Sequence, residues 1–306
     1  MKLYTGKGIL TPQPPFDFRK SLGFIRKFTP TRAEQQIGEG TLTKALFVRG
    51  QLCGFDLKSI GTIDAPKLEY TVYAACPIDP SLEIAILDQI AFAYSLRDDL
   101  QHFYELGRRD EDFASVVEML YGLHHVKFPT PFEGACWAVL SQRVPMAVGH
   151  QIKQALMEKY GERLTIGASP CWAFPDPDRL LQATQADLEF LLRNARKAEY
   201  LHAVIRAFHN VDETVLRSGD YDEVHRWLLN IKGIGEWSAE LILWRGLGRT
   251  PRWHITPDSI SGRRTMDAAS KVYGHGKTLS AKEFSAFAEQ YREWQGYWLY
   301  YLRTAS

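Results

Sequence analysis

Cysteines are few in this sequence of 306 residues, and the four that are present are widely scattered. They form no CxxC pair, and none follows Cys171, so the spacing argues against a zinc site and against disulfides. Isolated cysteines of this kind are typical of reduced structural thiols in a reducing compartment. We therefore expect an intracellular protein.

Long hydrophobic runs are also absent. The sequence contains no stretch of about 18 apolar residues, the length that a membrane-spanning helix needs. The opening residues, Met1 to Gly6, lack the apolar core of a signal peptide. We therefore expect no membrane contact and a cytoplasmic location.

A strong excess of positive charge is lacking as well, because the net charge is only +1. The charges are nevertheless unevenly distributed. Residues 1–60 carry 10 basic and 4 acidic side chains, residues 61–225 carry 15 and 25, and residues 226–306 carry 12 and 7. A local basic face is compatible with this distribution, and so is an ordinary solvated surface.

The hydrophobic content of 45% and the aromatic content of 12% describe a well-packed protein that is long enough for two or three domains. Before residue 80, a short amphipathic helix is predicted over 16–25, and strand-like segments follow at 43–48, 51–57 and 68–74. From Pro80 onward the pattern becomes helical. The sequence therefore predicts a mainly α protein with an N-terminal α/β domain.

Start and stop signals divide the helical part. Asp79-Pro80-Ser81 marks one helix start, and Thr184 is expected to cap another. Residues 132–160 predict a long helical stretch that breaks near Pro145, and residues 221–229 continue the same pattern.

The most informative segment runs from Leu228 to Ala239 and contains Gly233-Ile234-Gly235. A glycine-punctuated turn between two apolar helical patterns predicts a helix–hairpin–helix. The glycines allow a tight turn and a close approach of the backbone to another surface. The helix that begins after Gly235 presents unpaired N–H groups, which favour a phosphate.

Asp258 follows Gly235 by 23 residues. With this spacing the chain resembles the 3-methyladenine DNA glycosylase II family of the helix–hairpin–helix base-excision superfamily. Further segments carry the resemblance along nearly the whole chain: Pro15 to Phe18, Leu22 to Phe24, Phe132 to Gln142, Lys159 to Leu164, Arg196 to Glu199, and Trp294 to Tyr297.

The resemblance implies a monofunctional enzyme that flips alkylated purines, of the 3-methyladenine or 7-methylguanine type, out of duplex DNA. It would hydrolyse the N-glycosidic bond and leave an abasic site, in base excision repair. The implied domains are an N-terminal α/β domain (1–80), a central helical domain with the hairpin (128–245), and a second helical lobe from 81–127 and 246–306. The active cleft would lie between the two helical lobes.

Asp258 is the implied catalytic residue. A carboxylate near C1′ stabilises the positive charge of an oxocarbenium-like transition state and can orient the attacking water. The alternative is that Asp258 only caps a helix, a position that aspartate favours.

Trp237 occupies the hairpin position where the lyase branch of the superfamily carries a lysine that forms a Schiff base. No imine can form on tryptophan, so the resemblance implies hydrolysis without strand cleavage. Trp237 would stack on the extruded base, with about 0.5–2 kcal/mol of cation–π attraction for a cationic purine. The alternative is a core tryptophan, because Trp237, Leu241 and Trp244 share one helical face.

The remaining base-pocket candidates come from the same resemblance. Phe24 and Trp294 match pocket positions of the family, although each is equally consistent with ordinary core. Leu241 and Ser259 stand where some relatives carry tyrosines, so a roomier and less aromatic pocket is expected.

DNA-backbone binding is assigned to the amides of Gly233, Gly235 and Trp237, with Lys232 as an added basic contact. The family's hairpin carbonyls often hold a monovalent cation, which would place Leu229, Ile231 and Gly233 around Na⁺ or K⁺. No cofactor for catalysis, iron–sulfur cluster or zinc is expected.

The family inserts a wedge into the vacated base stack after a glutamine, here Gln142-Arg143. Many relatives carry an aliphatic residue there, so Arg143 either intercalates, bonds the orphaned base or binds phosphate. The pair His124-His125 is expected to be an ordinary surface pair and not a metal site.

Two alternatives stay open: a bifunctional glycosylase/lyase for oxidised bases, and a non-enzymatic DNA-binding module. The expected partner is double-stranded DNA with damaged bases, bound by a nucleoid-associated monomer.

Overall fold

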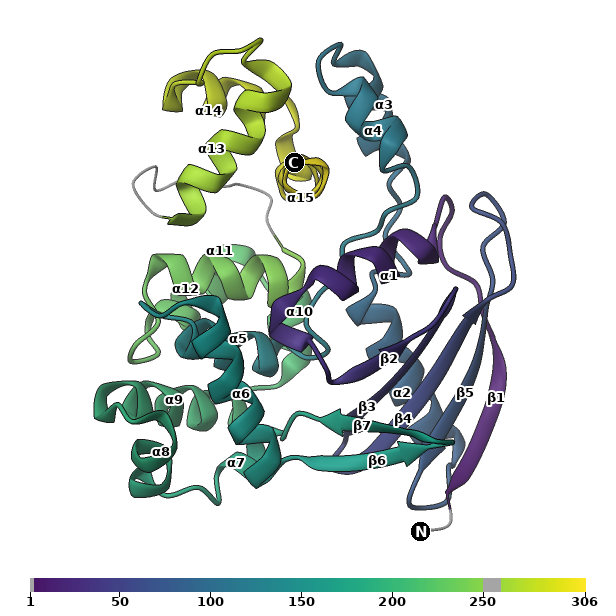
Figure 1. Ribbon diagram of the computed structural model, residues 1–306, viewed down its shortest axis with the longest axis vertical. Coiled ribbons are helices and arrows are strands. Elements are labelled where there is room, and N and C mark those ends of the chain that lie inside the picture. Colours follow the sequence, from purple (N-terminus) through teal and green to yellow (C-terminus); the bar gives the residue numbers. More distant parts are fainter. Residues whose placement is uncertain (1–2, 250–259) are drawn as a thin grey trace.

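The computed structural model describes residues 3–249 and 260–306 (Figure 1). It is mainly helical with an N-terminal antiparallel sheet, which confirms the predicted fold class. The sheet has the order β1-β5-β4-β3-β2. Its strands are β1 (Tyr4–Leu10), β2 (Gln35–Ile37), β3 (Thr41–Val48), β4 (Gln51–Ser59) and β5 (Leu68–Ala74).

The three strands predicted from composition, β3 to β5, form the middle of this sheet. The two edge strands were not predicted. β2 has only three residues, and β1 carries two glycines and no buried side chain, so neither has the apolar alternation of a half-buried strand.

Two helices pack on the N-terminal sheet. α1 (Phe18–Lys27) is capped by Asp17, and α2 (Pro80–Ala93) is capped by Asp79, as its start signal predicts. Apolar side chains of both helices join the core of the sheet. The position of α2 differs from the predicted division of the chain, which assigned residues 81–127 to the second helical lobe.

The central helices surround α5 (Pro131–Leu140), whose residues are all buried. The predicted break near Pro145 separates α5 from α6 (Met146–Tyr160). Thr184 caps α8 with a reciprocal capping box, as expected. The remaining helices of this group are α7 (Pro177–Leu180), α8 (Gln185–Leu192), α9 (Ala195–His209), α10 (Glu213–Ser218), α11 (Tyr221–Leu229) and α12 (Glu236–Leu241), followed by the π-helical turn η2 (Ile242–Leu247).

A third group of helices joins the end of the chain to an earlier segment. Aromatic side chains, with Trp298 and Tyr301 fully buried among them, fill its core. Trp244 at the end of the central group also packs into this core. The helices are α3 (Gln101–Arg109), α4 (Ala114–Met119), α13 (Ile260–Tyr273), α14 (Ala281–Gln290) and α15 (Gln295–Ala305), with the 3-10 turn η3 (Arg292–Trp294) before α15 (Figure 1).

A hairpin of β6 (Glu162–Ile166) and β7 (Ser169–Ala173) links the central helices to the N-terminal sheet. Its apolar side chains pack on β3 and β4 in a small separate core. The backbone N–H of Trp172 also donates to the carbonyl O of Glu34 at 3.2 Å. The sequence did not predict this hairpin.

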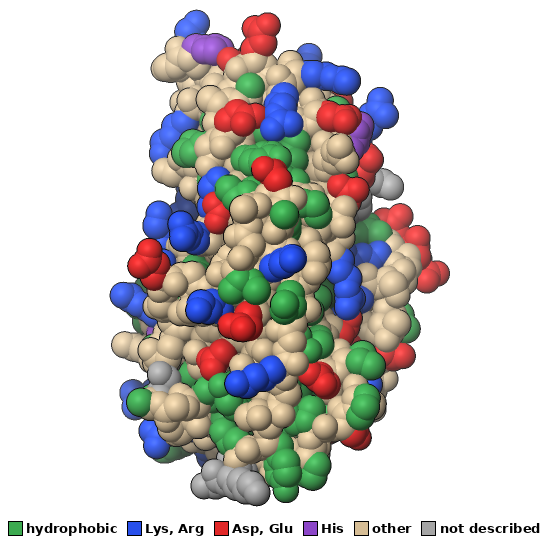
Figure 2. Space-filling model, turned by 90° about the vertical axis from the view of Figure 1, so that its right-hand side faces the viewer, with side chains coloured by type: hydrophobic (Ala, Val, Ile, Leu, Met, Phe, Trp, Pro, Cys, Tyr) green, Lys and Arg blue, Asp and Glu red, His purple; other side chains and the backbone are tan. Residues whose placement is uncertain are grey.

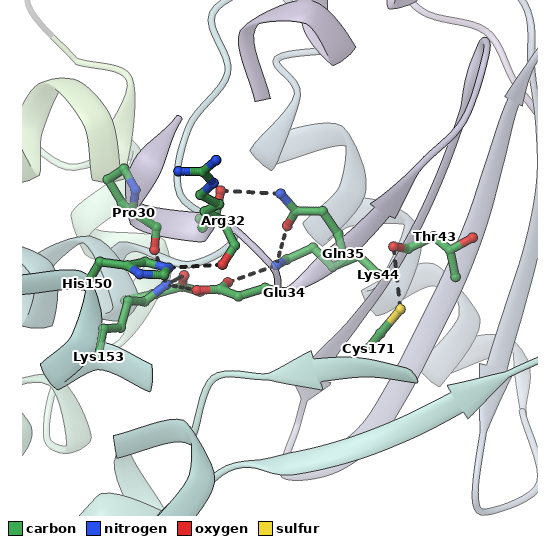
Figure 3. Close-up of polar contacts among 11 residues, drawn as sticks. Pro30, Arg32, Glu34, Gln35, Thr43, Lys44, His150, Lys153 and Cys171 are labelled. Carbon is green, nitrogen blue, oxygen red and sulfur yellow. Dashed lines mark hydrogen bonds and ion pairs between the residues drawn. The ribbon is translucent and has the colours of Figure 1, made fainter. Parts of the chain in front are cut away.

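A buried ionic network fixes α5 and α6 to the segment around Glu34 (Figure 3). The Lys153 ammonium, fully buried on α6, pairs with Glu34 and with Glu133 (2.6 Å), and it donates to the carbonyl O of Pro30 at 2.9 Å. Lys44 on β3 pairs with Glu34 at 3.1 Å. Burial alone would raise the pKa of Glu34, but Lys153 and Lys44 outweigh burial and lower it.

The pKa of Glu133, the second carboxyl of the network, shifts in the opposite direction to that of Glu34. Burial raises the pKa of Glu133, and the nearby charge of Glu34 acts in the same direction although Lys153 opposes it. One ammonium therefore serves two carboxylates of different proton affinity. α5 and α6 lead into and out of the turn at residues 141–145, so the network also anchors that turn.

Positive and negative side chains are interspersed on the face seen when the molecule is turned by 90° (Figure 2). No helix within residues 3–249 and 260–306 is long and apolar enough to cross a membrane.

Candidate functional site

The predicted helix–hairpin–helix is formed by α11, the turn at residues 230–235 and α12. α11 begins after an Asp220 cap and ends at Leu229, and α12 begins directly after Gly235. The apolar residues Leu228, Ile231 and Ile234 anchor both sides of the turn in the central core. Packing against the central core therefore fixes the position of the hairpin.

The two glycines of the turn serve different purposes. Gly233 has φ +91, and a Cβ on it would lie 2.1 Å from Cγ of Tyr200 on α9, so only glycine fits. Gly235 has φ −99, and a Cβ on it would meet no atom within 4 Å. The fold thus requires Gly233, whereas the space over Gly235 is open to an approaching molecule.

Gln142 and Arg143 lie beside this hairpin but differ in their contacts. The Gln142 side-chain amide donates to the carbonyl O of Gly233 at 2.8 Å and to the Ser238 hydroxyl at 3.1 Å. Gln142 therefore braces the hairpin. Arg143 is exposed and has φ +53, a left-handed conformation that costs energy for a residue with a Cβ. Of the two predicted wedge residues, Arg143 is the accessible one.

The other hairpin candidates are partly engaged within the protein. The exposed Lys232 forms an ion pair with Glu199. The Ile231 carbonyl accepts from the N–H of Ile234 at 3.0 Å, and the Gly233 carbonyl accepts from Gln142. Each carbonyl keeps a second lone pair, so these hydrogen bonds leave an acceptor site on both oxygens. The cation stays a prediction.

Trp237 and Leu241 on α12 and Trp244 in η2, which the sequence spacing places on one helical face, differ in burial. Trp237 is 38% exposed, Leu241 is half-buried against the central core, and Trp244 is only 5% exposed. Core packing therefore accounts for Trp244, while much of the Trp237 ring is available for stacking. The pocket role of Leu241 stays a prediction.

Phe24 on α1 and Trp294 in η3 are both half-buried and pack against the aromatic C-terminal core. The ring of Trp294 lies 6.1 Å from that of Phe103, and its indole N–H has no hydrogen-bond partner among residues 3–249 and 260–306. Phe24 makes an edge contact with Tyr300, with 5.2 Å between ring centroids. Both predicted pocket residues thus pack against the same core, that of the C-terminal group of helices.

Asp258 and Ser259 lie outside the described residues. The described chain ends at Arg249, whose guanidinium donates to the Leu216 carbonyl at 2.9 Å and also to the Gly219 carbonyl, and it resumes at Ile260, the first residue of α13.

The expectation of a surface pair at His124-His125 was wrong, because both side chains are buried. The ring nitrogens of His124 face the carbonyls of Ser95 (2.6 Å) and Pro15 (2.9 Å). His125 Nε2 lies 3.0 Å from Nη1 of Arg245. Burial, together with the charge of Arg245, holds the pKa of His125 well below its ordinary value, so its ring is neutral.

Sequence reasoning also missed two charged groups near the hairpin. Arg245 in η2 is only 4% exposed, which one sequence cannot reveal because arginine is usually at the surface. Glu240 on α12 is half-buried. Burial, with a contribution from Glu236, raises the pKa of Glu240 to about 7. Among the described residues, no three His, Cys, Asp or Glu side chains are grouped as a metal site would require.

Comparison with known proteins gives a consistent result for this region. Residues 136–278, which include the hairpin, match the family described as HhH-GPD superfamily base excision DNA repair protein. A curated relative, the DNA-3-methyladenine glycosylase of Bacillus subtilis, is 23% identical over 296 residues, covering 96% of this chain and 95% of that protein.

Solved structures share the whole architecture. The 3-methyladenine DNA-glycosylase of Archaeoglobus fulgidus superposes with a TM-score of 0.76 at 19% identity, covering 97% of both chains. An 8-oxoguanine glycosylase/lyase of Clostridium acetobutylicum has a TM-score of 0.65 at 16% identity, covering 98% of this chain and 97% of that one. The fold is common to enzymes with different base preferences. Residues 136–278 therefore match an HhH-GPD domain of the base excision DNA repair superfamily, and the chain shares the fold of these glycosylases.

Proposed function

We propose that the protein is a monofunctional DNA glycosylase that excises damaged purines, alkylated ones in particular, from duplex DNA and leaves an abasic site. The observation that carries the proposal is Trp237, a partly exposed tryptophan directly after the hairpin of an HhH-GPD domain. Its indole offers a stacking surface and has no amine for a lyase reaction.

DNA binding would begin at the hairpin. The open space over Gly235 and the first N–H groups of α12 suit a phosphate oxygen, and backbone contacts of this kind position DNA without reading its sequence. The brace from Gln142 holds the turn in place, and Arg143 in the adjoining turn would fill the vacated base stack.

Base excision would then rest on Asp258. Its carboxylate would stabilise the oxocarbenium-like sugar and orient water for attack on C1′. A purine methylated on N3 or N7 leaves as a neutral base, so a general acid is not strictly required. Trp237, Phe24 and Trp294 would form a pocket that selects by shape and stacking.

The test is single-turnover excision of 3-methyladenine, 7-methylguanine, hypoxanthine and uracil from one duplex, with wild type and Asp258→Asn. We expect Asp258→Asn to abolish excision and to bind abasic-site DNA nearly as well as wild type. Wild-type rates in the variant would remove Asp258 from catalysis. Failure of the wild type on all substrates, with DNA binding intact, would favour the binding-module alternative.

The second candidate function is a bifunctional glycosylase/lyase, which the shared fold with the Clostridium acetobutylicum enzyme keeps open. A lyase forms a covalent imine with the sugar, and borohydride traps it as an adduct. We expect no adduct, because position 237 carries no amine. Duplex DNA as partner and a monomeric state belong to the same proposal.

A further inference from the structure

Arg245 is a buried cation enclosed by aromatic rings. It lies in η2, directly after α12, and is only 4% exposed. Its guanidinium carbon lies over the rings of Phe24 at 4.6 Å, Phe28 at 4.7 Å and Tyr300 at 5.5 Å, measured to the centroids. Phe24 and Phe28 belong to the end of α1 and Tyr300 belongs to α15, so the cation lies where η2 meets these two segments.

The charge of Arg245 is not neutralised by a carboxylate within residues 3–249 and 260–306. Its Nη1 donates to the neutral ring of His125 at 3.0 Å, and the Tyr300 hydroxyl also interacts with the guanidinium. Among the described residues, Nη2 meets no acceptor at hydrogen-bond geometry. Burial lowers the pKa of Arg245 to about 10, so the group is still charged at neutral pH. Among the described residues, the negative faces of the surrounding rings and the Tyr300 hydroxyl compensate this charge.

This arrangement changes what Phe24 offers to a ligand. A cation over one face of an aromatic ring weakens the attraction of the ring for a second cation on the other face. Phe24 is half-buried and so retains accessible surface, as a pocket wall must. Trp237 has no cation over its ring among the described residues, so the two proposed walls differ in electrostatic character.

We infer that Arg245 weakens the preference of the base pocket for positively charged alkylated purines and so admits neutral damaged purines, such as hypoxanthine, beside them. The inference rests on the proposed function, because it takes Phe24 as a wall of the base pocket. A base stacked on Phe24 would lie about 8 Å from the guanidinium, where a unit charge on the base changes occupancy by about tenfold.

The chemistry of a neutral base points in the same direction. When water attacks C1′, the electron pair of the C1′–N9 bond stays on the purine. A neutral purine then takes up the proton that the water loses, whereas for a cationic purine that proton passes to solvent. A neutral purine is transiently anionic in this step, whereas a cationic one becomes neutral. The positive potential of Arg245 therefore stabilises the departure of a neutral purine more than that of a cationic one.

The test compares Arg245→Met with wild type in single-turnover excision of cationic 7-methylguanine and neutral hypoxanthine from the same duplex sequence. We expect the rate ratio of 7-methylguanine to hypoxanthine to rise about tenfold in Arg245→Met. The matched control is Lys127→Met, which also removes a buried positive charge but one that lies over Phe92 and not over Phe24. It should change the ratio by less than about twofold.

An unchanged ratio in a folded Arg245→Met, or an equal rise in Lys127→Met, overturns the inference while leaving the proposed function intact. If the wild type excises neither 7-methylguanine nor hypoxanthine, that result contradicts the proposed function instead. If Arg245→Met does not fold, the wild type still decides through competitive inhibition by neutral 7-methylguanine and cationic 7,9-dimethylguanine. Equal or stronger inhibition by the neutral purine supports the inference, and weaker inhibition by the neutral purine overturns it.

Discussion

Replacing each hairpin glycine by alanine should separate a folding requirement from a DNA-binding requirement. In Gly233→Ala, the new methyl group would lie 2.1 Å from Cγ of Tyr200, and the backbone would have to keep φ near +91. The left-handed conformation costs about 1–2 kcal/mol, and overpacking costs about 1–3 kcal/mol. We therefore expect the free energy of unfolding to fall by about 2–5 kcal/mol.

Gly235→Ala should behave differently. Its φ of −99 suits any residue, and the added methyl group meets no atom within 4 Å. The free energy of unfolding should change by less than about 0.5 kcal/mol. The methyl group would, however, stand where a phosphate is proposed to approach. Loss of one charge-assisted contact predicts about tenfold weaker binding to duplex DNA.

Urea denaturation followed by tryptophan fluorescence measures the free energy of unfolding. Fluorescence anisotropy with an abasic-site duplex measures the affinity for DNA. Both variants are measured in parallel, each as control for the other. Wild-type stability in Gly233→Ala would contradict the steric argument. Wild-type affinity in a stably folded Gly235→Ala would refute the proposed phosphate contact at the hairpin.

Two further predictions concern buried lysines. Lys153→Met leaves the Glu133 carboxyl buried without its ammonium and leaves Glu34 with Lys44 alone, so the free energy of unfolding should fall by about 3–5 kcal/mol. Lys159→Met removes an exposed ion pair from the same helix and should cost less than about 1 kcal/mol. Equal losses in urea denaturation would contradict this. Burial lowers the pKa of Lys127 from 10.5 to about 8. Between these two pH values the unfolded chain binds more protons than the folded protein does. The stability that Lys127 contributes therefore rises with pH in this range. Between about pH 7.5 and about pH 10, the free energy of unfolding of the wild type should therefore rise by up to about 3 kcal/mol relative to that of Lys127→Met. If the difference between the two free energies does not change with pH, the lowered pKa of Lys127 is wrong.

Local signals were sufficient where a segment specifies its own structure. The helix starts at Asp79 and Thr184, the break near Pro145 and the limits of α11 all follow from capping chemistry or apolar periodicity, and all are confirmed. The β6–β7 hairpin was missed because its packing partners on β3 and β4 are more than a hundred residues away in the sequence. The buried state of His124 was missed for the same reason, since its partners Ser95 and Pro15 are distant.

The sequence by itself determined the hairpin, the mainly helical fold with its N-terminal sheet, and the tryptophan at position 237, because turn chemistry, periodicity and residue identity are local properties. Only the tertiary structure decided which candidates are accessible. It placed Gln142 as a brace, left Trp237 exposed and enclosed Arg245 among rings from the N-terminal and C-terminal parts of the chain. Burial and electrostatic environment depend on which distant segments pack together, and no local pattern in one chain encodes that.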